Sequence, residues 1–268
     1  MSDQLSAIVK KAYSLLTLDH QIVGAKFAAT REDYEKMEAK KLVAKLAYCV
    51  MVKAAMSCKS LKLSHDYSGC SGSTRALGFK KPTEDFISGE IYNGFGLYKD
   101  LTTSKSVADN MSFCKKSNYG IMVKPLELYK EEVPDVVIIA ADSRNAMRII
   151  QGYTYMYAAQ SNFKMTGNQA ICVECTSYPF ESEQINISML CSGTRYLAKW
   201  KDTEIAIGIP FHKFKNTIEG VLKTANAVEL DARKTAIQQN LLRKGLPIPE
   251  FEYGHTYYTD IEKKNKKL

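Results

Sequence analysis

A short cysteine-containing segment occurs twice in this chain, and it constrains the fold more than any other feature. Gly69–Leu77 reads Gly-Cys-Ser-Gly-Ser-Thr-Arg-Ala-Leu, and Leu190–Leu197 reads Leu-Cys-Ser-Gly-Thr-Arg-Tyr-Leu. Each copy follows a further cysteine in a similar setting, Cys49 after Ala-Tyr and Cys172 after Ala-Ile, at separations of 21 and 19 residues. Because several positions recur in the same order, the sequence predicts an internal duplication.

Each half also begins with an apolar run that is typical of a buried strand, Ile22–Phe27 in the first half and Val136–Ala141 in the second. Two like halves tend to pack about a pseudo-twofold axis, which brings equivalent positions together at their interface. The residues that we expect to converge there are Cys49, Cys70, Cys172 and Cys191.

Hydrophobic periodicity predicts a mixture of helices and strands. The expected helices cover residues 3–17, 43–55 and 143–157, with one or two more within 213–245. The expected strands cover residues 22–27, 119–125, 135–141, 169–175, 185–190 and 204–210. These helices and strands do not alternate in a regular βαβ order, so the sequence favours an α+β fold of two pseudo-duplicated α/β halves packed about a shared interface. The expected organisation is an N-terminal helix (1–20), a first half (21–130), a second half (131–225) and a C-terminal helix and tail (226–268).

Composition narrows the class of protein. A chain of 268 residues that is 45% hydrophobic can bury a sizeable core, and its apolar runs are too short to span a bilayer. The start Met1–Leu5 lacks the basic and apolar regions of a signal peptide, so we expect a cytoplasmic protein with no membrane partner. The net charge of +8 is partly concentrated in Glu262–Lys267 and arises mostly from lysine, which favours a solvated surface over nucleic-acid binding. The remaining expected partners are a small-molecule ligand or a redox protein, and the oligomeric state is left open.

The chain has seven cysteines, too irregularly spaced for a disulfide framework. Four of them on separate segments suit an iron–sulfur cluster, which takes four thiolates and tolerates wide spacing. Structural zinc more often uses two Cys-x2-Cys pairs, whereas only Cys172 and Cys175 form one here, so zinc is the second choice. Two further interpretations stay open: covalent thiol chemistry, and cysteines that serve only as small buried hydrophobic residues.

Three of the four cysteines are followed by a cation that could contact a bound anion or cluster. Lys53 lies four residues after Cys49, and Arg75 and Arg195 follow the two Cys-Ser-Gly turns. If helices begin near residues 73 and 194, each arginine falls in a first turn, where a cation opposes the helix dipole and needs a tertiary partner. That partner is either a carboxylate or a bound anion. Lys53, Arg75 and Arg195 are therefore candidate cofactor-binding residues, and the alternative for each is an ordinary surface cation.

The cysteine segments resemble those of the family labelled domain of unknown function 169, which occurs in many anaerobic bacteria and archaea. The resemblance covers roughly residues 20–225 and departs from the family in lacking a further cysteine near Thr194. The segments that carry it are Val23–Phe27, Ala47–Lys53, Cys70–Gly72, Ala76–Phe79, Gly96–Asp100, Pro134–Ile139, Ala146–Arg148, Asn168–Cys172, Cys191–Arg195 and Ile207–Phe211. The resemblance implies an uncharacterised family and no particular reaction.

Two functional classes follow from these observations. The first is a cysteine-centred metalloprotein that binds an iron–sulfur cluster for a redox or sulfur-handling role. The second is a non-catalytic binding or sensory protein for a small anionic ligand in a two-lobed cleft. No Walker loop, dinucleotide-binding glycine pattern or zinc-protease motif favours another enzyme class, and the sequence leaves open whether the chain is an enzyme.

Overall fold

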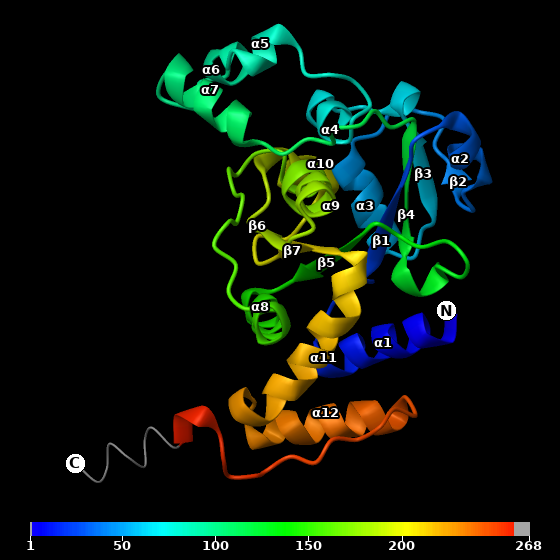
Figure 1. Cartoon of the computed structure of the whole chain (residues 1–268), viewed down its shortest axis with the longest axis vertical. Coiled ribbons are helices and arrows are strands. Elements are labelled where there is room, and N and C mark those ends of the chain that lie inside the picture. Colours follow the sequence, from blue (N-terminus) through cyan, green and yellow to red (C-terminus); the bar gives the residue numbers. More distant parts are fainter. Residues whose placement is uncertain (1, 260–268) are drawn as a thin grey trace.

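A computed structural model describes residues 2–259 and folds them around one seven-stranded sheet (Figure 1). Met1 and residues 260–268, with the basic run Glu262–Lys267, lie outside the described residues. The order across the sheet is β2-β3-β4-β1-β5-β7-β6, in which only β2 and β3 pair in parallel. The strands are β1 (Val23–Ala28), β2 (Lys40–Lys41), β3 (Leu61–Ser64), β4 (Gly120–Pro125), β5 (Val136–Ala141), β6 (Asn186–Ser188) and β7 (Ile205–Pro210).

The two strands at the centre of the sheet, β1 and β5, come from the two predicted halves. They pair antiparallel, with Val23 opposite Ile138. On their outer sides lie β4 and β7, each antiparallel to its central strand and each ending in a proline, Pro125 opposite Val23 and Pro210 opposite Val136. The next strands outward are β3 and β6, again antiparallel.

Helices cover both faces of the sheet, above and below it in Figure 1. One core lies beneath α3 (Tyr48–Met56), α4 (Ser71–Ala76), the π-helix η3 (Ala170–Ser177), α9 (Tyr178–Ser182) and α10 (Ser192–Ala198). The other lies beneath α1 (Ser2–Leu15), α8 (Ser143–Tyr157), α11 (Phe211–Val228) and α12 (Asp231–Arg243). Strand β5 contributes side chains to both cores. Val136 and Ile138 belong to the first core and Val137 and Ile139 to the second, because successive side chains of a strand point to opposite faces of the sheet.

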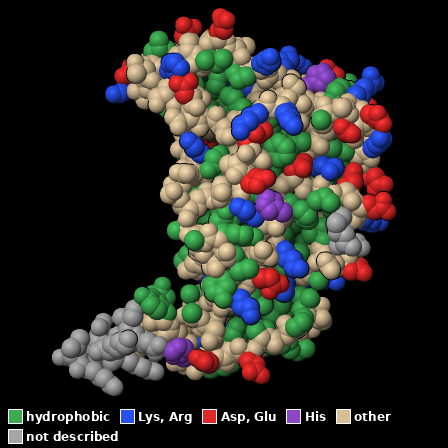
Figure 2. Space-filling view, viewed as in Figure 1, with side chains coloured by type: hydrophobic (Ala, Val, Ile, Leu, Met, Phe, Trp, Pro, Cys, Tyr) green, Lys and Arg blue, Asp and Glu red, His purple; other side chains and the backbone are tan. Residues whose placement is uncertain are grey.

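Three short helices form a lobe between α4 and β4 that projects at the top of Figure 1. They are α5 (Glu84–Ile87), α6 (Glu90–Gly94) and α7 (Leu101–Asn110), and hydrophobic side chains are visible on their surface in Figure 2. Phe86, Tyr92 and Ala108 join the lobe to the core beneath α3 and η3. The remaining short elements are α2 (Arg31–Lys36), η1 (His65–Tyr67) and η2 (Leu126–Leu128).

The α+β class is confirmed, and so are the strands predicted near residues 22–27, 119–125, 135–141, 185–190 and 204–210. The strand predicted at 169–175 is wrong, because that segment is the π-helix η3. The predicted helix at 43–55 begins only at Tyr48, and Val43 is 73% exposed. The segment 213–245 contains two helices, α11 and α12.

Candidate functional site

The four cysteines of the two repeated segments lie at the starts of four helices. Cys49 is the second residue of α3 and Cys172 the third residue of η3, whereas Cys70 and Cys191 are the N-cap residues of α4 and α10. These helices contact one another: α3 packs against η3 and α10, and η3 packs against α4. The structure therefore brings the four segments together above one face of the sheet.

The four thiols lie within electrostatic range of one another. Burial raises the pKa of Cys49 to about 11, and the neighbouring Cys191 and Cys70 thiols raise it further. Burial also raises the pKa of Cys172 well above its ordinary value, and Cys70, Cys191 and Cys49 act in the same direction. Because like charges oppose each other, negative charge on the neighbouring sulfurs disfavours ionisation of Cys49 and Cys172, and a bound positive group would relieve that repulsion.

Thr194 connects two of the thiols. Its backbone N–H donates to Cys191 Sγ at 3.4 Å, and its hydroxyl lies 3.1 Å from the same sulfur. The hydroxyl is also a hydrogen-bond partner of the Cys49 thiol, which lowers the pKa of that group. Sequence reasoning gave this buried threonine no role, although its position three residues after an N-cap residue is where a capping hydrogen bond forms.

Backbone strain accompanies two of the cysteines. Leu190, directly before Cys191, has a φ of +70°, and Gln169, three residues before Cys172, has a φ of +51°. Left-handed backbone in residues other than glycine costs about 1–3 kcal/mol and gathers at functional sites, as π-helical turns such as η3 also do. The structure thus holds both segments in conformations that local propensity does not favour.

The other three cysteines have other neighbours. Cys58 is exposed near the end of α3, and Cys114 is buried, donating its backbone N–H to the carbonyl of Ala76. Cys175 is fully buried, which raises the pKa of its thiol well above the ordinary value, and its electrostatic neighbour is Glu174.

The side chains do not form a ligand set for a single metal ion. Across residues 2–259, no three or more His, Cys, Asp or Glu side chains are arranged to hold one ion.

The two arginines of the repeat have different surroundings. The helices begin at Ser71 and Ser192, so Arg75 and Arg195 lie in the last turn of α4 and α10, and the first-turn placement expected from the sequence is wrong. A cation is favoured near a helix C-terminus, so no local conflict exists there. Arg195 donates to the carbonyls of Lys201, Met189 (3.0 Å) and Glu204 (3.3 Å), which closes the loop after α10.

Arg75 is buried, with 9% of the residue exposed, and its guanidinium carbon lies 4.4 Å from the centre of the Phe86 ring. Its Nε has no hydrogen-bond partner among the described residues. Lys53 differs again: its ammonium group lies 3.0 Å from Glu204, 3.0 Å from His20 Nε2 and 4.7 Å from the centre of the Trp200 ring. A carboxylate therefore already balances the charge of Lys53.

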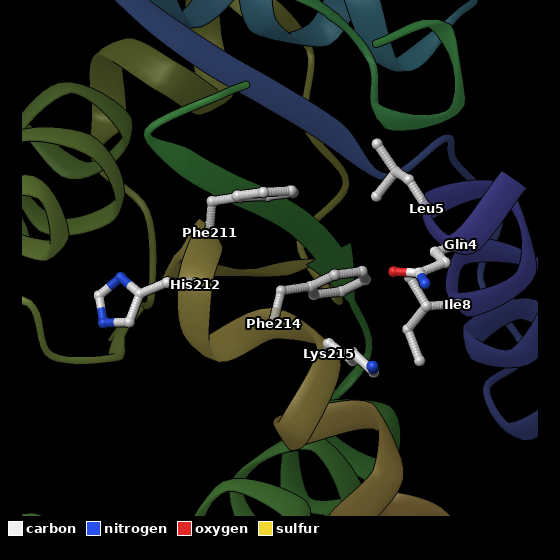
Figure 3. A pocket seen from close by; sticks show the side chains of 7 residues that line it. All are labelled: Gln4, Leu5, Ile8, Phe211, His212, Phe214 and Lys215. Atoms are coloured by element: carbon white, nitrogen blue, oxygen red, sulfur yellow. The ribbon is translucent and has the colours of Figure 1, made fainter. Parts of the chain in front are cut away.

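Two cavities lie away from the cysteines. One of about 230 Å³ separates α1 from the start of α11 (Figure 3). In Figure 3, Phe211 and Phe214 point from α11 towards Leu5 of α1, whereas His212 points to the opposite side. Its walls are mainly apolar and offer few groups for chemistry. A larger, open cavity of about 670 Å³ lies beside Phe180 and Asp135 and contains both acidic and basic side chains but no thiol.

The fold and the site define an α+β protein with four thiols gathered at the starts of four helices. The chain belongs to the family DUF169, described as an uncharacterised ArCR family, whose profile matches residues 12–220. It is also similar to the uncharacterised protein MJ0308 of Methanocaldococcus jannaschii, with 25% identity over 218 residues that cover 79% of this chain and 91% of the relative. No solved structure matches the chain. Among the described helices, none has the length and apolar character needed to cross a membrane.

Proposed function

We propose that this protein binds an iron–sulfur cluster through Cys49, Cys70, Cys172 and Cys191 and uses it in a redox or sulfur-handling reaction. The observation that carries the proposal is that four cysteines lie at the starts of four helices that pack together, close enough for Cys49 and Cys172 to be coupled electrostatically to the other thiols. Cysteines that serve only as small hydrophobic residues have no reason to gather in this way, since Cys58 and Cys114 do not. Thiolates are the ligands of such clusters.

The topology supports the idea that the site lies between two duplicated halves. Apart from α2, β2, η1, α5–α7 and η2 in the first half and α8, α9 and α11 in the second, the first half runs β1–α3–β3–α4–β4 and the second runs β5–η3–β6–α10–β7, with a cysteine at the start of each of the helices α3, α4, η3 and α10. Across the sheet, β3-β4-β1 mirrors β6-β7-β5. The contacts are reciprocal as well: α3 meets its counterpart η3, and α3 meets α10 as η3 meets α4. Reciprocal contacts are what a pseudo-twofold axis produces.

The placement of the cysteines on separate segments favours a cluster over a zinc ion. An iron–sulfur cluster takes four thiolates and tolerates wide ligand spacing, which suits four cysteines at four separate helix starts, whereas structural zinc more often uses two Cys-x2-Cys pairs. When bound, the cluster would supply electrons or a Lewis-acidic iron. The chain itself would exclude water by burying Cys172, and Thr194 would donate a hydrogen bond to the Cys191 sulfur, which tunes the potential of a cluster.

Anaerobic purification followed by iron and sulfide analysis tests the proposal. We expect equal amounts of iron and acid-labile sulfide in the wild type, with broad absorbance in the blue, and a loss of most iron in Cys49→Ser, Cys70→Ser, Cys172→Ser and Cys191→Ser. Cys58→Ser and Cys175→Ser are matched controls that should keep it. A colourless, iron-free wild type after reconstitution would contradict the proposal and favour the second class, a protein that binds a small anion without chemistry.

A further inference from the structure

Arg75 stands out among the buried cations of the described chain. The other four have partners: Arg148 pairs with Glu229 at 2.9 Å and Lys124 with Glu132 at 2.6 Å, while Lys62 donates to the carbonyl of Met37 at 3.0 Å and Lys234 to that of His255 at 2.7 Å. Arg75 rests on the Phe86 ring, and its Nε is buried without a hydrogen-bond partner. Removing a guanidinium from water costs several kcal/mol, whereas a ring contact returns about 0.5–2 kcal/mol. Among residues 2–259, no ion pair therefore balances the charge of the Arg75 guanidinium.

Asp85 is a carboxylate whose pKa the Arg75 charge lowers, but its side chain faces water. Asp85 is exposed, and its carboxylate accepts the backbone N–H of Phe86 at 2.9 Å. Its pKa is lowered first by a hydrogen bond with Thr83, and Arg75 contributes less than the other causes. Asp85 therefore binds backbone in the first turn of α5, and among the described residues no ion pair joins it to Arg75.

A second unpartnered polar atom lies in the same neighbourhood. Gln169 Oε1 is buried and has no hydrogen-bond partner among residues 2–259, while its Nε2 donates to the Tyr92 hydroxyl. The Gln169 side chain lies against Gly72 at the start of α4, where an added Cβ would be 3.3 Å away. Tyr92 is coupled electrostatically to both Arg75 and Cys172. An unused donor and an unused acceptor therefore border the same side of the cysteine site.

We infer that Arg75 anchors a small anionic substrate beside the four cysteines, between α4, η3 and the lobe α5–α7. A guanidinium offers two parallel N–H donors to a carboxylate or phosphate, and Gln169 Oε1 would accept a hydrogen bond from a neutral N–H or O–H group of the same molecule. Phe86 and Tyr92, whose ring centres are 5.5 Å apart, supply the apolar wall. This inference rests on the proposed function, because it names the class of substrate that would bind next to the proposed cluster.

Calorimetric titration of metal-free, reduced protein tests the binding separately from the cluster. Inorganic phosphate and succinate are titrated in separate arms at constant ionic strength, which distinguishes a phosphate site from a carboxylate site. We expect one of them to bind at one per chain, Arg75→Lys to weaken that binding at least tenfold because the fork is lost, and Arg75→Met to abolish it. Binding of neither anion to the wild type overturns the inference.

The repeat provides a matched control, because Arg195 holds only carbonyl groups of its own half and a weak, 3.9 Å ion pair with Asp202. Arg195→Lys should change anion affinity less than twofold. Gln169→Glu keeps the size of the side chain but places a carboxylate beside Arg75, so it should raise the melting temperature and weaken anion binding at least tenfold. Equal weakening by the Arg75 and Arg195 variants would overturn the inference.

Iron content separates the two proposals. Arg75→Lys should retain the iron and sulfide of the wild type while losing anion affinity. Loss of iron in this variant, together with unchanged anion affinity, would assign Arg75 to the cluster and overturn the substrate role. If the wild type binds the anion but no cluster, the anion site stands and the iron–sulfur proposal alone fails.

Discussion

Burial and repulsion from the neighbouring thiols together raise the pKa of Cys49 and Cys172 and so favour their protonated forms in the metal-free protein. Both effects act on Cys49 and Cys172 in the same direction, and only the hydrogen bonds to these sulfurs oppose them. A cationic metal centre would reverse the balance, because thiolates are the ligands and binding releases their protons. Loading of the site should therefore become more favourable as pH rises through the neutral range.

Whereas metal binding should become more favourable as pH rises, the unfolding free energy of the metal-free protein should decrease at alkaline pH. The pKa of Cys49 is raised from 9.0 to about 11 in the folded state. Between these values the unfolded chain loses the proton and the folded chain keeps it, so the free energy of unfolding falls as pH rises. Urea titrations from pH 8 to pH 11 should show a smaller fall in Cys49→Ser than in the wild type, and Cys58→Ser should fall like the wild type. Equal slopes for all three proteins would refute this account.

Lys53 should matter for stability more than for cluster binding. Burial opposes ionisation of Glu204, yet hydrogen bonds from Lys53 and His20 hold the pKa of its carboxyl below the ordinary value. Lys53→Met would leave this buried carboxylate with His20 and the Lys201 N–H but without its ammonium partner, so at pH 7 we expect a loss of about 1.5–3 kcal/mol in unfolding free energy. Lys53→Met with Glu204→Leu should recover part of the loss. Iron content should stay at the wild-type value, and a large drop would show that Lys53 serves the cluster.

At the scale of elements, the packing of η3 on the sheet fixes the position of Cys172. Gly208 of β7 lies directly under η3, where an added Cβ would be 2.3 Å from the carbonyl oxygen of Cys175. Asn186 of β6 binds the same helix, since its Nδ2 donates to the carbonyl of Glu174 at 2.8 Å. The two strands nearest the sheet edge thus hold a helix that carries a proposed ligand.

Gly208→Ala should therefore displace η3 and reduce both stability and iron content. Backbone atoms cannot move as a flexible side chain can, so a loss of about 1–3 kcal/mol in unfolding free energy is expected. Gly94→Ala is the matched control, because a Cβ there meets nothing within 4 Å. Replacing this glycine should leave stability unchanged or raise it by about 0.4–1 kcal/mol. Thermal denaturation and iron analysis of both variants check the prediction, which fails if Gly208→Ala behaves like the control.

Periodicity predicted most strands but could not identify η3. Ile171 and Val173 are β-branched and buried, and a short run that is apolar on every side has no period that separates a strand from a helix. The lobe α5–α7 was not predicted either, since its helices are short and joined by turns. Consequently the sequence pointed to the cysteines and to Arg75, but the contribution of Tyr92 and Gln169 depends on tertiary packing that no local pattern records.

At the scale of the whole molecule, the sheet separates two layers of helices, and only one of them contains the proposed cluster ligands. The layer with α3, α4, η3 and α10 carries the cysteines, and two of these helices come from each half. The opposite layer, with α1, α8, α11 and α12, has its own core and, within the described residues, none of the seven cysteines. It includes the close crossing of α8 and α11, where an added Cβ on Gly220 would be 2.0 Å from the carbonyl oxygen of Gly152. A cluster bound by the four cysteines would therefore link the two halves only within the layer that contains α3, α4, η3 and α10.

Hydrogen exchange measured by mass spectrometry should reveal this division. Binding stabilises the folded state of the segments that contact the ligand, and local opening is suppressed where ligands from distant segments share one centre. Reconstituted protein should thus exchange at least tenfold more slowly than metal-free protein in α3, α4, η3 and α10, whereas α8 and α11 should change little. Protection confined to α3 and α4 would mean that only the first half supplies ligands. Because the proposed site takes two thiolates from each half, protection must appear in both halves together, and its absence from η3 and α10 would refute the shared site.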